Sequence, residues 1–226
     1  MSLPFMSAVR TLPEEPYLTL ARTDTVVMLG DSLTGTDYAY WLSLQESTNV
    51  AFMCTGDLTV PTYINSGVNS NQSSNWLADV QTRVIDHEPT VLIMTGPVND
   101  GHDNGVTPLP IQDTEDNLNG VLDACLLANP ALKVLMVGPW IYGGTRPNGS
   151  NAYDTALDAI NEVVGQIAAE RGFGYVDVRS KYFTDTVGVS VVSTDGVHPE
   201  AAGATVGAGD RYLSAQVAGK ILLDLS

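Results

Sequence analysis

The sequence predicts an α/β fold: a three-layer α/β/α sandwich with a central, mostly parallel sheet of about five strands. Short, uninterrupted apolar runs alternate along the chain with longer segments whose apolar residues recur at helical spacing. Uninterrupted apolar runs are typical of parallel strands, because helices bury such strands on both faces. The runs lie at residues 25–29, 63–65, 91–94, 134–137 and 175–178.

Helical segments are expected between and after these runs, at about residues 38–44, 76–85, 114–126, 153–167 and 201–223. Pro89 is expected to end the second segment, because proline disrupts the interior of a helix. Asp113 or Thr114 can cap the third segment, and Gly172 can close the fourth. Alternation of strand and helix along the whole chain favours helical crossovers between parallel strands.

The length of 226 residues fits a single domain, residues 1–226, that buries a full core. Residues 1–22, with prolines at positions 4, 13 and 16, are expected to form an irregular arm packed on this domain. They lack a basic segment followed by a long apolar core, so no signal peptide is predicted. No apolar run approaches the roughly 20 residues of a membrane span, so we expect a soluble protein whose compartment and oligomeric state are open.

The composition excludes several classes of partner. A net charge of −16, with 10 Lys and Arg against 26 Asp and Glu, argues against nucleic acid and anionic membrane surfaces. Cys54 and Cys125 both follow apolar patterns and are expected to be buried thiols rather than a disulfide. No zinc-type cluster, calcium-loop spacing or phosphate-binding glycine loop is present, so neither a metal nor a cofactor is predicted.

The main functional signal is a serine directly after the first apolar run, in the turn Gly30-Asp31-Ser32-Leu33. In a parallel sheet such a turn lies at the carboxyl edge, where ligands bind. A serine there often only caps a helix, but a second motif, Asp195-Gly196-Val197-His198-Pro199, adds a carboxylate and an imidazole. A hydroxyl, an imidazole base and an orienting acid are the groups that nucleophilic acyl transfer requires.

The sequence contains four short motifs, in the order Gly30-Asp31-Ser32-Leu33, Asn65-Ser66-Gly67-Val68-Asn69, Thr95-Gly96-Pro97-Val98-Asn99-Asp100 and Asp195-Gly196-Val197-His198-Pro199. With these four blocks the sequence resembles the SGNH or GDSL hydrolases. The resemblance implies the flavodoxin-like fold of that family, with Ser32 as nucleophile, His198 as base and Asp195 as the acid that orients it. It also implies an oxyanion hole formed by the Ser32 and Gly67 N–H groups and the Asn99 side chain.

The third block departs from the family pattern, because Pro97 stands two residues before Asn99 where the family usually has glycine. Among the other histidines, His87 is expected to be solvated at a helix end, and His102 is expected near the site.

Candidate substrate-binding residues are Asp31, His102, Trp140 and Tyr142. Trp140 and Tyr142 follow the fourth apolar run directly, and they either line the substrate pocket or cap the core.

These residues together imply a serine ester hydrolase that works through an acyl-enzyme. The loops after the strands are rich in Asn, Ser, Thr and Gly and contain no apolar lid, which favours a small acyl ester of a polar or carbohydrate alcohol, for example an O-acetyl group. Two alternatives stay open: a lysophospholipase or thioesterase type of lipid acylhydrolase, and a non-catalytic carbohydrate-binding module on the same fold.

Overall fold

A computed structural model describes residues 18–35, 40–56, 58–101, 107–139, 151–179 and 214–224 of the protein. Its central sheet consists of β2 (Thr25–Gly30), β3 (Thr62–Gly67), β4 (Val91–Thr95), β5 (Lys133–Val137) and β6 (Gly174–Val176). The strands lie in the order β3-β2-β4-β5-β6, and every neighbouring pair is parallel. This order is flavodoxin-like, because β3 lies on one side of β2 and the later strands extend the sheet on the other. The predicted α/β class and parallel sheet are confirmed.

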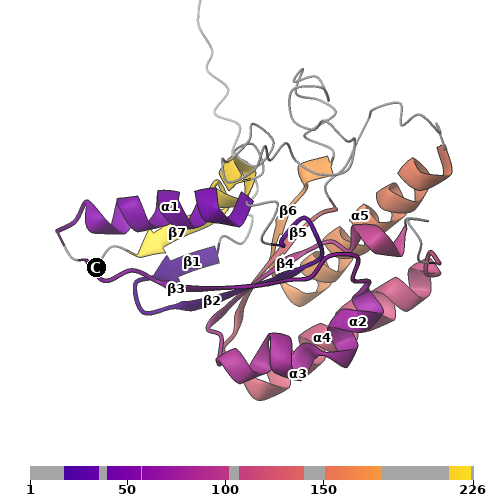
Figure 1. Ribbon diagram of the computed structural model, residues 1–226, viewed down its shortest axis with the longest axis horizontal. Helices are drawn as coiled ribbons and strands as arrows, with labels where there is room; N and C mark the ends of the chain where they lie inside the picture. Colours follow the sequence, from indigo (N-terminus) through magenta and orange to yellow (C-terminus); the bar gives the residue numbers. More distant parts are fainter. Residues whose placement is uncertain are drawn as a thin grey trace, which may run out of the picture.

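The connecting helices form the two outer layers (Figure 1). They are α1 (Tyr40–Met53), α2 (Ser73–Ala78), α3 (Val80–Arg83), the 3-10 turns η1 (Ile85–His87) and η2 (Val98–Asp100), α4 (Ile111–Ala128) and α5 (Asn151–Arg171). Crossovers between parallel strands are right-handed. The chain moves along the sheet in one direction from β2 to β3 and in the opposite direction from β3 through β4 and β5 to β6, so α1 lies on one face of the sheet and α2 to α5 lie on the other. Contacts of α4 with both α2 and α5 are those expected within one layer.

The core lies between the sheet and these helices. All side chains of β4 are buried, because strands flank it on both sides and helices cover it. The apolar face predicted for α4 also faces the core, since Leu118, Val121, Leu122 and Cys125 are buried. Gly172 follows the last residue of α5, as predicted.

Two helical segments differ from the prediction. The first continues to Met53, and Cys54, in the turn after it, is exposed rather than buried. Cys125 is buried as predicted, and burial raises the pKa of its thiol to about 11; both cysteines are free. The second segment is divided into α2, α3 and η1. The apolar residues at helical spacing still face the core, because Trp76 and Val84 are both buried although they lie in different short segments.

The predicted cap of α4 was wrong, because the helix begins at Ile111 after Pro110 and Thr114 is buried inside it.

A second sheet corrects two other expectations. β1 (Leu18–Ala21) pairs in parallel with β7 (Ile221–Asp224), so part of the predicted irregular arm is a strand. Residues 214–218 are helical, but residues 221–223, expected to be helical, belong to β7.

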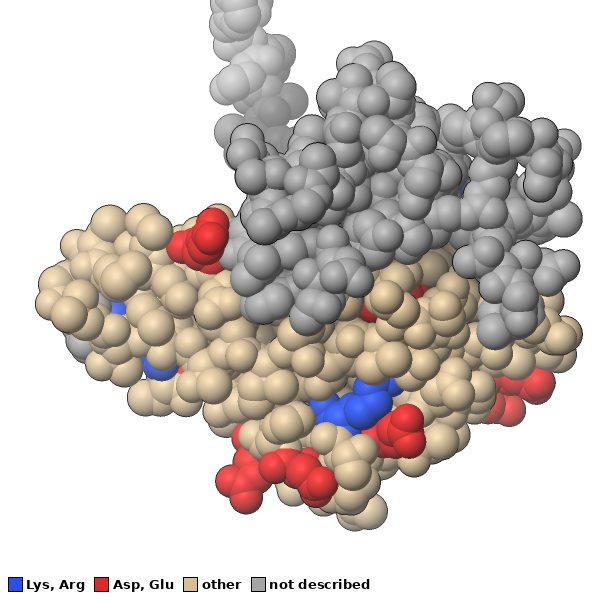
Figure 2. All heavy atoms as spheres, viewed as in Figure 1, with Lys and Arg blue, Asp and Glu red and all other residues tan. Residues whose placement is uncertain are grey.

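Acidic side chains occur at several separate places on the face of the molecule shown in Figure 2, where Lys and Arg of the described residues form no continuous stripe. This distribution agrees with the large negative net charge of the sequence. Within the described ranges, no helix combines the length and apolar character needed to cross a membrane.

Candidate active site

Ser32 and Asn99 both lie at the carboxyl edge of the sheet. Ser32 is the second residue after β2, and Asn99 lies in η2, shortly after β4. β2 and β4 are neighbours in the sheet, although β3 separates them along the chain. In such folds a crevice opens above the carboxyl ends of two strands of this kind. Both residues are 8% exposed, so each lies at the boundary between the core and the surface.

Residues 31–35, which we call the nucleophile turn after the role predicted for Ser32, leave β2 in a tight turn. The backbone oxygen of Asp31 accepts hydrogen bonds from the N–H groups of Thr34 (3.1 Å) and Gly35 (2.9 Å). The hydroxyl of Thr34 donates to the hydroxyl of Thr95, at the end of β4, over 3.1 Å. The backbone around Ser32 is therefore held both by the turn itself and by the neighbouring strand.

The carboxylate of Asp31 joins the nucleophile turn to the segment after β4. Its Oδ1 accepts the N–H of Leu33 over 2.9 Å, and its Oδ2 accepts the N–H of Val98 over 3.1 Å. Burial, together with a smaller effect of the Asp100 charge, raises the pKa of Asp31 to about 7, although these two hydrogen bonds lower it. The predicted contact of Asp31 with substrate is wrong, because its side chain is 0% exposed and both oxygens are used inside the fold.

Residues 96–100, which we call the Asn99 turn, accommodate the unusual Pro97. A Cβ atom on Gly96 would lie 2.7 Å from the backbone nitrogen of Pro139, so the close approach of the segment after β5 requires glycine at position 96. Pro97 has no N–H to satisfy, and its carbonyl accepts the N–H of Asp100 over 3.2 Å. The side-chain amide of Asn99 then donates to the backbone oxygen of Asn71 over 3.0 Å.

Asp100 anchors the Asn99 turn to the start of α2. Its carboxylate accepts the backbone N–H of Ser73 over 2.8 Å and the hydroxyl of Ser73 over 2.5 Å. Burial raises the pKa of Asp100, which is 0% exposed. The Gln72 side chain adds a second link, because its Nε2 donates to the backbone oxygen of Asn99 over 3.2 Å.

Gly67, the predicted second oxyanion donor, is the last residue of β3 and lies beneath the nucleophile turn. A Cβ atom at this position would lie 2.4 Å from the backbone nitrogen of Gly35, so only glycine lets the two backbones approach this closely. Its N–H donates to Oδ1 of Asn65 over 2.8 Å. The geometry therefore gives Gly67 a packing role, and its role as an oxyanion donor stays a prediction.

Arg83, at the end of α3, is a residue near the site that the sequence analysis missed. Its Nη2 donates to the backbone oxygens of Gly30 (3.0 Å) and Ser66, which are the carbonyls at the ends of β2 and β3. The Ser66 hydroxyl donates in return to the backbone oxygen of Arg83 over 2.6 Å. An arginine on a helix is usually solvated, so nothing in the sequence indicated this contact.

Several predicted site residues lie outside the described residues: Asp195, His198, His102, Trp140 and Tyr142. His87 is exposed in η1, just before β4 begins, and so lies at the amino edge of the sheet, away from Ser32. Among the described residues, no group of three or more His, Cys, Asp or Glu side chains is arranged to hold a metal ion.

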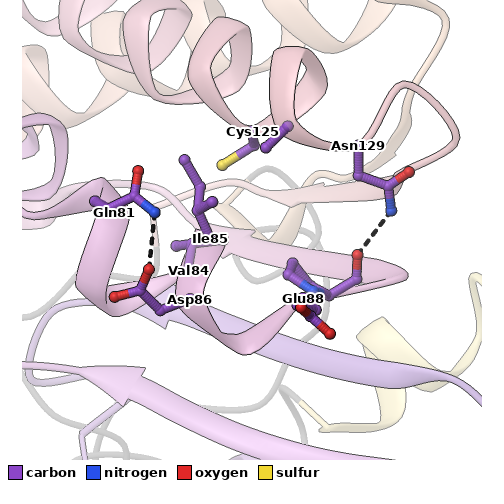
Figure 3. Close-up of a pocket in the computed structure, with 9 residues that line it drawn as sticks. Gln81, Val84, Ile85, Asp86, Glu88, Cys125 and Asn129 are labelled. Carbon is purple, nitrogen blue, oxygen red and sulfur yellow. Dashed lines mark hydrogen bonds between the residues drawn. The ribbon is translucent and has the colours of Figure 1, made fainter.

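A pocket of about 570 Å³ also lies at the amino edge of the sheet (Figure 3). It is formed by the segment before β4 and the end of α4, and the Cys125 side chain points into it from α4. Two hydrogen bonds support its walls, from Gln81 to Asp86 (2.8 Å) and from Asn129 to the backbone oxygen of Pro89 (2.9 Å). Its lining contains none of the predicted site residues, so this pocket is separate from the candidate active site.

Comparison with known proteins places the chain in a family. The pattern that describes the GDSL-like lipase/acylhydrolase family matches residues 28–206. The chain belongs to this family. A catalytic triad and an oxyanion hole are typical of GDSL-like lipases and acylhydrolases, and the chain is a carboxylic ester hydrolase. No match was found among curated proteins.

Solved structures of GDSL-like proteins share the fold. A lipase/acylhydrolase from Enterococcus faecalis is 16% identical, with 87% of this chain and 94% of that chain covered and a TM-score of 0.70. A catalytic mutant of an acetylxylan esterase from Geobacillus stearothermophilus is 18% identical, with 89% and 95% covered and a TM-score of 0.71. A GDSL-like lipase from Parabacteroides merdae is 14% identical, with 91% and 98% covered and a TM-score of 0.72.

Proposed function

We propose that this ester hydrolase uses Ser32 as nucleophile, His198 as general base and Asp195 as the carboxylate that orients the base. The observation that carries the proposal is the position of Ser32 on the nucleophile turn, beside the Asn99 turn at the carboxyl edge of the sheet. In the proposed reaction His198 accepts the Ser32 proton while Oγ attacks the ester carbonyl. The bond to the alcohol then breaks, and His198 returns the proton to the departing alcohol. Water activated by His198 finally releases the acid from the acyl-enzyme.

The oxyanion of this reaction is proposed to accept hydrogen bonds from the Ser32 N–H and the Asn99 side chain, with the Gly67 N–H as a third donor. The Asn99 amide supports this assignment, because it carries two N–H donors and Asn71 accepts one of them. Gly67 contributes only if its N–H leaves Asn65. Donors already fixed in position are effective because they need no reorganisation as charge develops on the carbonyl oxygen.

The proposed substrate is a small acyl ester, such as an O-acetyl group, on a polar or carbohydrate alcohol. Polar side chains that follow β3 support this class, because Asn69 and Ser70 are exposed close to the nucleophile turn. The net charge of −16 favours a neutral substrate over an anionic one. The similar fold of the Geobacillus acetylxylan esterase makes acetylated xylan a direct first choice for assays. His102, Trp140 and Tyr142 stay proposed substrate contacts.

The test is a rate series with p-nitrophenyl esters of increasing acyl length, together with acetylated xylan, for the wild type and Ser32→Ala. We expect the acetyl ester to be hydrolysed fastest, and Ser32→Ala to lose about 10³-fold or more in kcat while its Tm is unchanged. A folded Ser32→Ala variant with wild-type activity would overturn the nucleophile assignment. Preference for long acyl chains would favour a lipid acylhydrolase, and no hydrolysis of the acetyl esters would overturn the proposed substrate class.

A further inference from the structure

We propose that Asp31 is a positioning residue, whose carboxylate sets the distance and orientation between the nucleophile turn and the Asn99 turn. This inference rests on the proposed function, because it takes Ser32 as the nucleophile and Asn99 as an oxyanion donor. The two N–H groups that Asp31 accepts belong to Leu33 and Val98, the immediate neighbours of those two residues in the chain.

The bonding pattern requires a carboxylate. Oδ1 and Oδ2 of Asp31 each accept one backbone N–H, from two elements that are far apart in the sequence. Asparagine has the same shape but only one side-chain oxygen, and its NH₂ group would face one of the two N–H donors. An Asp31→Asn variant therefore keeps at most one of the two hydrogen bonds, and the other turn loses its fixed position.

Burial of the Asp31 carboxylate lowers the free energy of unfolding of the protein, because the charge loses its hydration. Asp31 is 0% exposed, and of the described Lys, Arg and His side chains none forms an ion pair with it. A second buried carboxylate, Asp100, adds to the free-energy cost of the charge, and the guanidinium of Arg83, whose pKa the Asp31 charge raises, offsets part of that cost. A buried charge kept at such a cost is typical of a functional site, where stability and activity trade off.

Asp24 provides a matched comparison, because it is also a buried aspartate and directly precedes β2, at the opposite end of the strand. Its carboxylate pairs with the Lys133 ammonium over 2.6 Å and accepts the hydroxyl of Thr90 over 2.6 Å. Asp24 thus has the partners of a structural ion pair at the amino edge of the sheet, far from the nucleophile turn. Within the described part of the chain, the side chain of Asp31 accepts hydrogen bonds from backbone N–H groups alone, and both belong to the two turns of the site.

The expected consequence of losing the Asp31 contacts is a misplaced oxyanion donor rather than an unfolded protein. A displacement of about 1 Å within a catalytic site can cost about 10²-fold in rate. The effect should fall on kcat, because Asn99 is needed where charge develops in the transition state, and leave KM nearly unchanged.

The experiment compares kcat, KM and Tm for the wild type, Asp31→Asn and the matched control Asp24→Asn. We expect Asp31→Asn to lower kcat by about 10- to 100-fold at unchanged KM. Asp24→Asn should lower Tm and leave kcat within about twofold of the wild type, because it removes a partner of a buried ion pair far from the site. Wild-type kcat in folded Asp31→Asn would overturn the proposal, as would an equal kcat loss in both variants.

A double-mutant cycle with Asn99→Ala separates positioning from a general structural effect. If Asp31 acts by placing Asn99, the Asp31→Asn/Asn99→Ala double variant loses less kcat than the product of the two single losses. Fully multiplicative losses would overturn the proposed coupling. If Asp31→Asn does not fold, Asp31→Ser is measured instead, and loss of the fold in both variants assigns Asp31 to stability and overturns the positioning role.

Failure of this inference is distinguishable from failure of the proposed function. An inactive Ser32→Ala variant together with a fully active Asp31→Asn variant overturns the positioning role alone. An active, folded Ser32→Ala variant overturns the proposed function, whatever the result at Asp31.

Discussion

The side chain of Asn99 donates a hydrogen bond to the backbone oxygen of Asn71 over 3.0 Å. This bond connects the turn after β4 with the loop after β3. Because one N–H of the amide is fixed in this way, the direction of its other N–H is fixed as well. Pro97 does not disturb the arrangement, since no donor is required of that residue.

Replacement of Asn99 by Ala is expected to lower kcat by about 10²- to 10³-fold with little change in KM. The reason is that the amide is needed for the oxyanion and not for the neutral ester carbonyl. Steady-state kinetics and thermal melting should be measured on the same preparation. A lower Tm with nearly unchanged kcat would mean that Asn99 only holds the loop at Asn71.

Gly67→Ala is expected to lower both Tm and kcat, because the added methyl group collides with the backbone at Gly35, 2.4 Å away. The nucleophile turn must move to relieve this overlap, and Ser32 moves with it. Gly172→Ala is the control: its φ of +69° strains an alanine and lowers Tm, but no atom lies within 4 Å of the added Cβ, so kcat should stay at the wild-type value. Wild-type kcat in Gly67→Ala would show that the turn is not held in the way described.

The ratio kcat/KM is expected to rise with pH between about 6 and 7, because only neutral His198 accepts the serine proton. The Asp31 carboxyl, whose pKa is raised by burial to about 7, ionises in the same range and adds to this rise. His198→Ala should abolish activity. His87→Ala is the control and should be fully active, since His87 is exposed at the other edge of the sheet. Equal losses in the two variants would contradict the choice of base.

The aspartates at the two ends of β2 are expected to affect stability with different pH dependences. The pKa of Asp31 is about 7 in the folded protein, whereas an unfolded aspartate titrates near pH 3.9. Between these values the folded state binds more protons than the unfolded state, so the Asp31 contribution to stability is lost as pH rises. Burial by itself raises the pKa of Asp24, but hydrogen bonds from the Ala21 N–H, Lys133 and Thr90, with the charge of Lys133, hold it below its ordinary value.

Urea unfolding between about pH 5 and 8 checks this prediction, and this range stays above the isoelectric point of about 4.2. The free energy of unfolding of the wild type should fall relative to Asp31→Asn as pH rises. The difference between the wild type and Asp24→Asn should stay constant, because Asp24 is ionised in both states throughout the range. A constant difference for Asp31→Asn would show that its carboxylate is already ionised at pH 5.

The five strands of the central sheet were predictable from sequence, because an uninterrupted apolar run such as 134–137 is typical of a strand buried between two layers. β1 and β7 were not, because their pairing joins the two ends of the chain. The turn at Ser32 was predictable for a similar reason, since its glycine, carboxylate and hydroxyl are adjacent in the chain. The bond from Val98 to Asp31 was not predictable, because it depends on β2 and β4 being neighbours. The role of Arg83 depends likewise on where the ends of β2 and β3 come together.

Leu18 of β1 pairs with Ile221 of β7, about two hundred residues further along the chain. Contacts between such distant segments form late in folding, because a long loop must close before the pairing compensates for the lost entropy. During translation, the apolar Leu18 and Leu20 leave the ribosome well before their partner strand exists. An unpaired apolar strand is a site for association with other chains. The docking of β7 should therefore limit the yield of soluble protein, and slower synthesis or a chaperone that covers β1 should raise it.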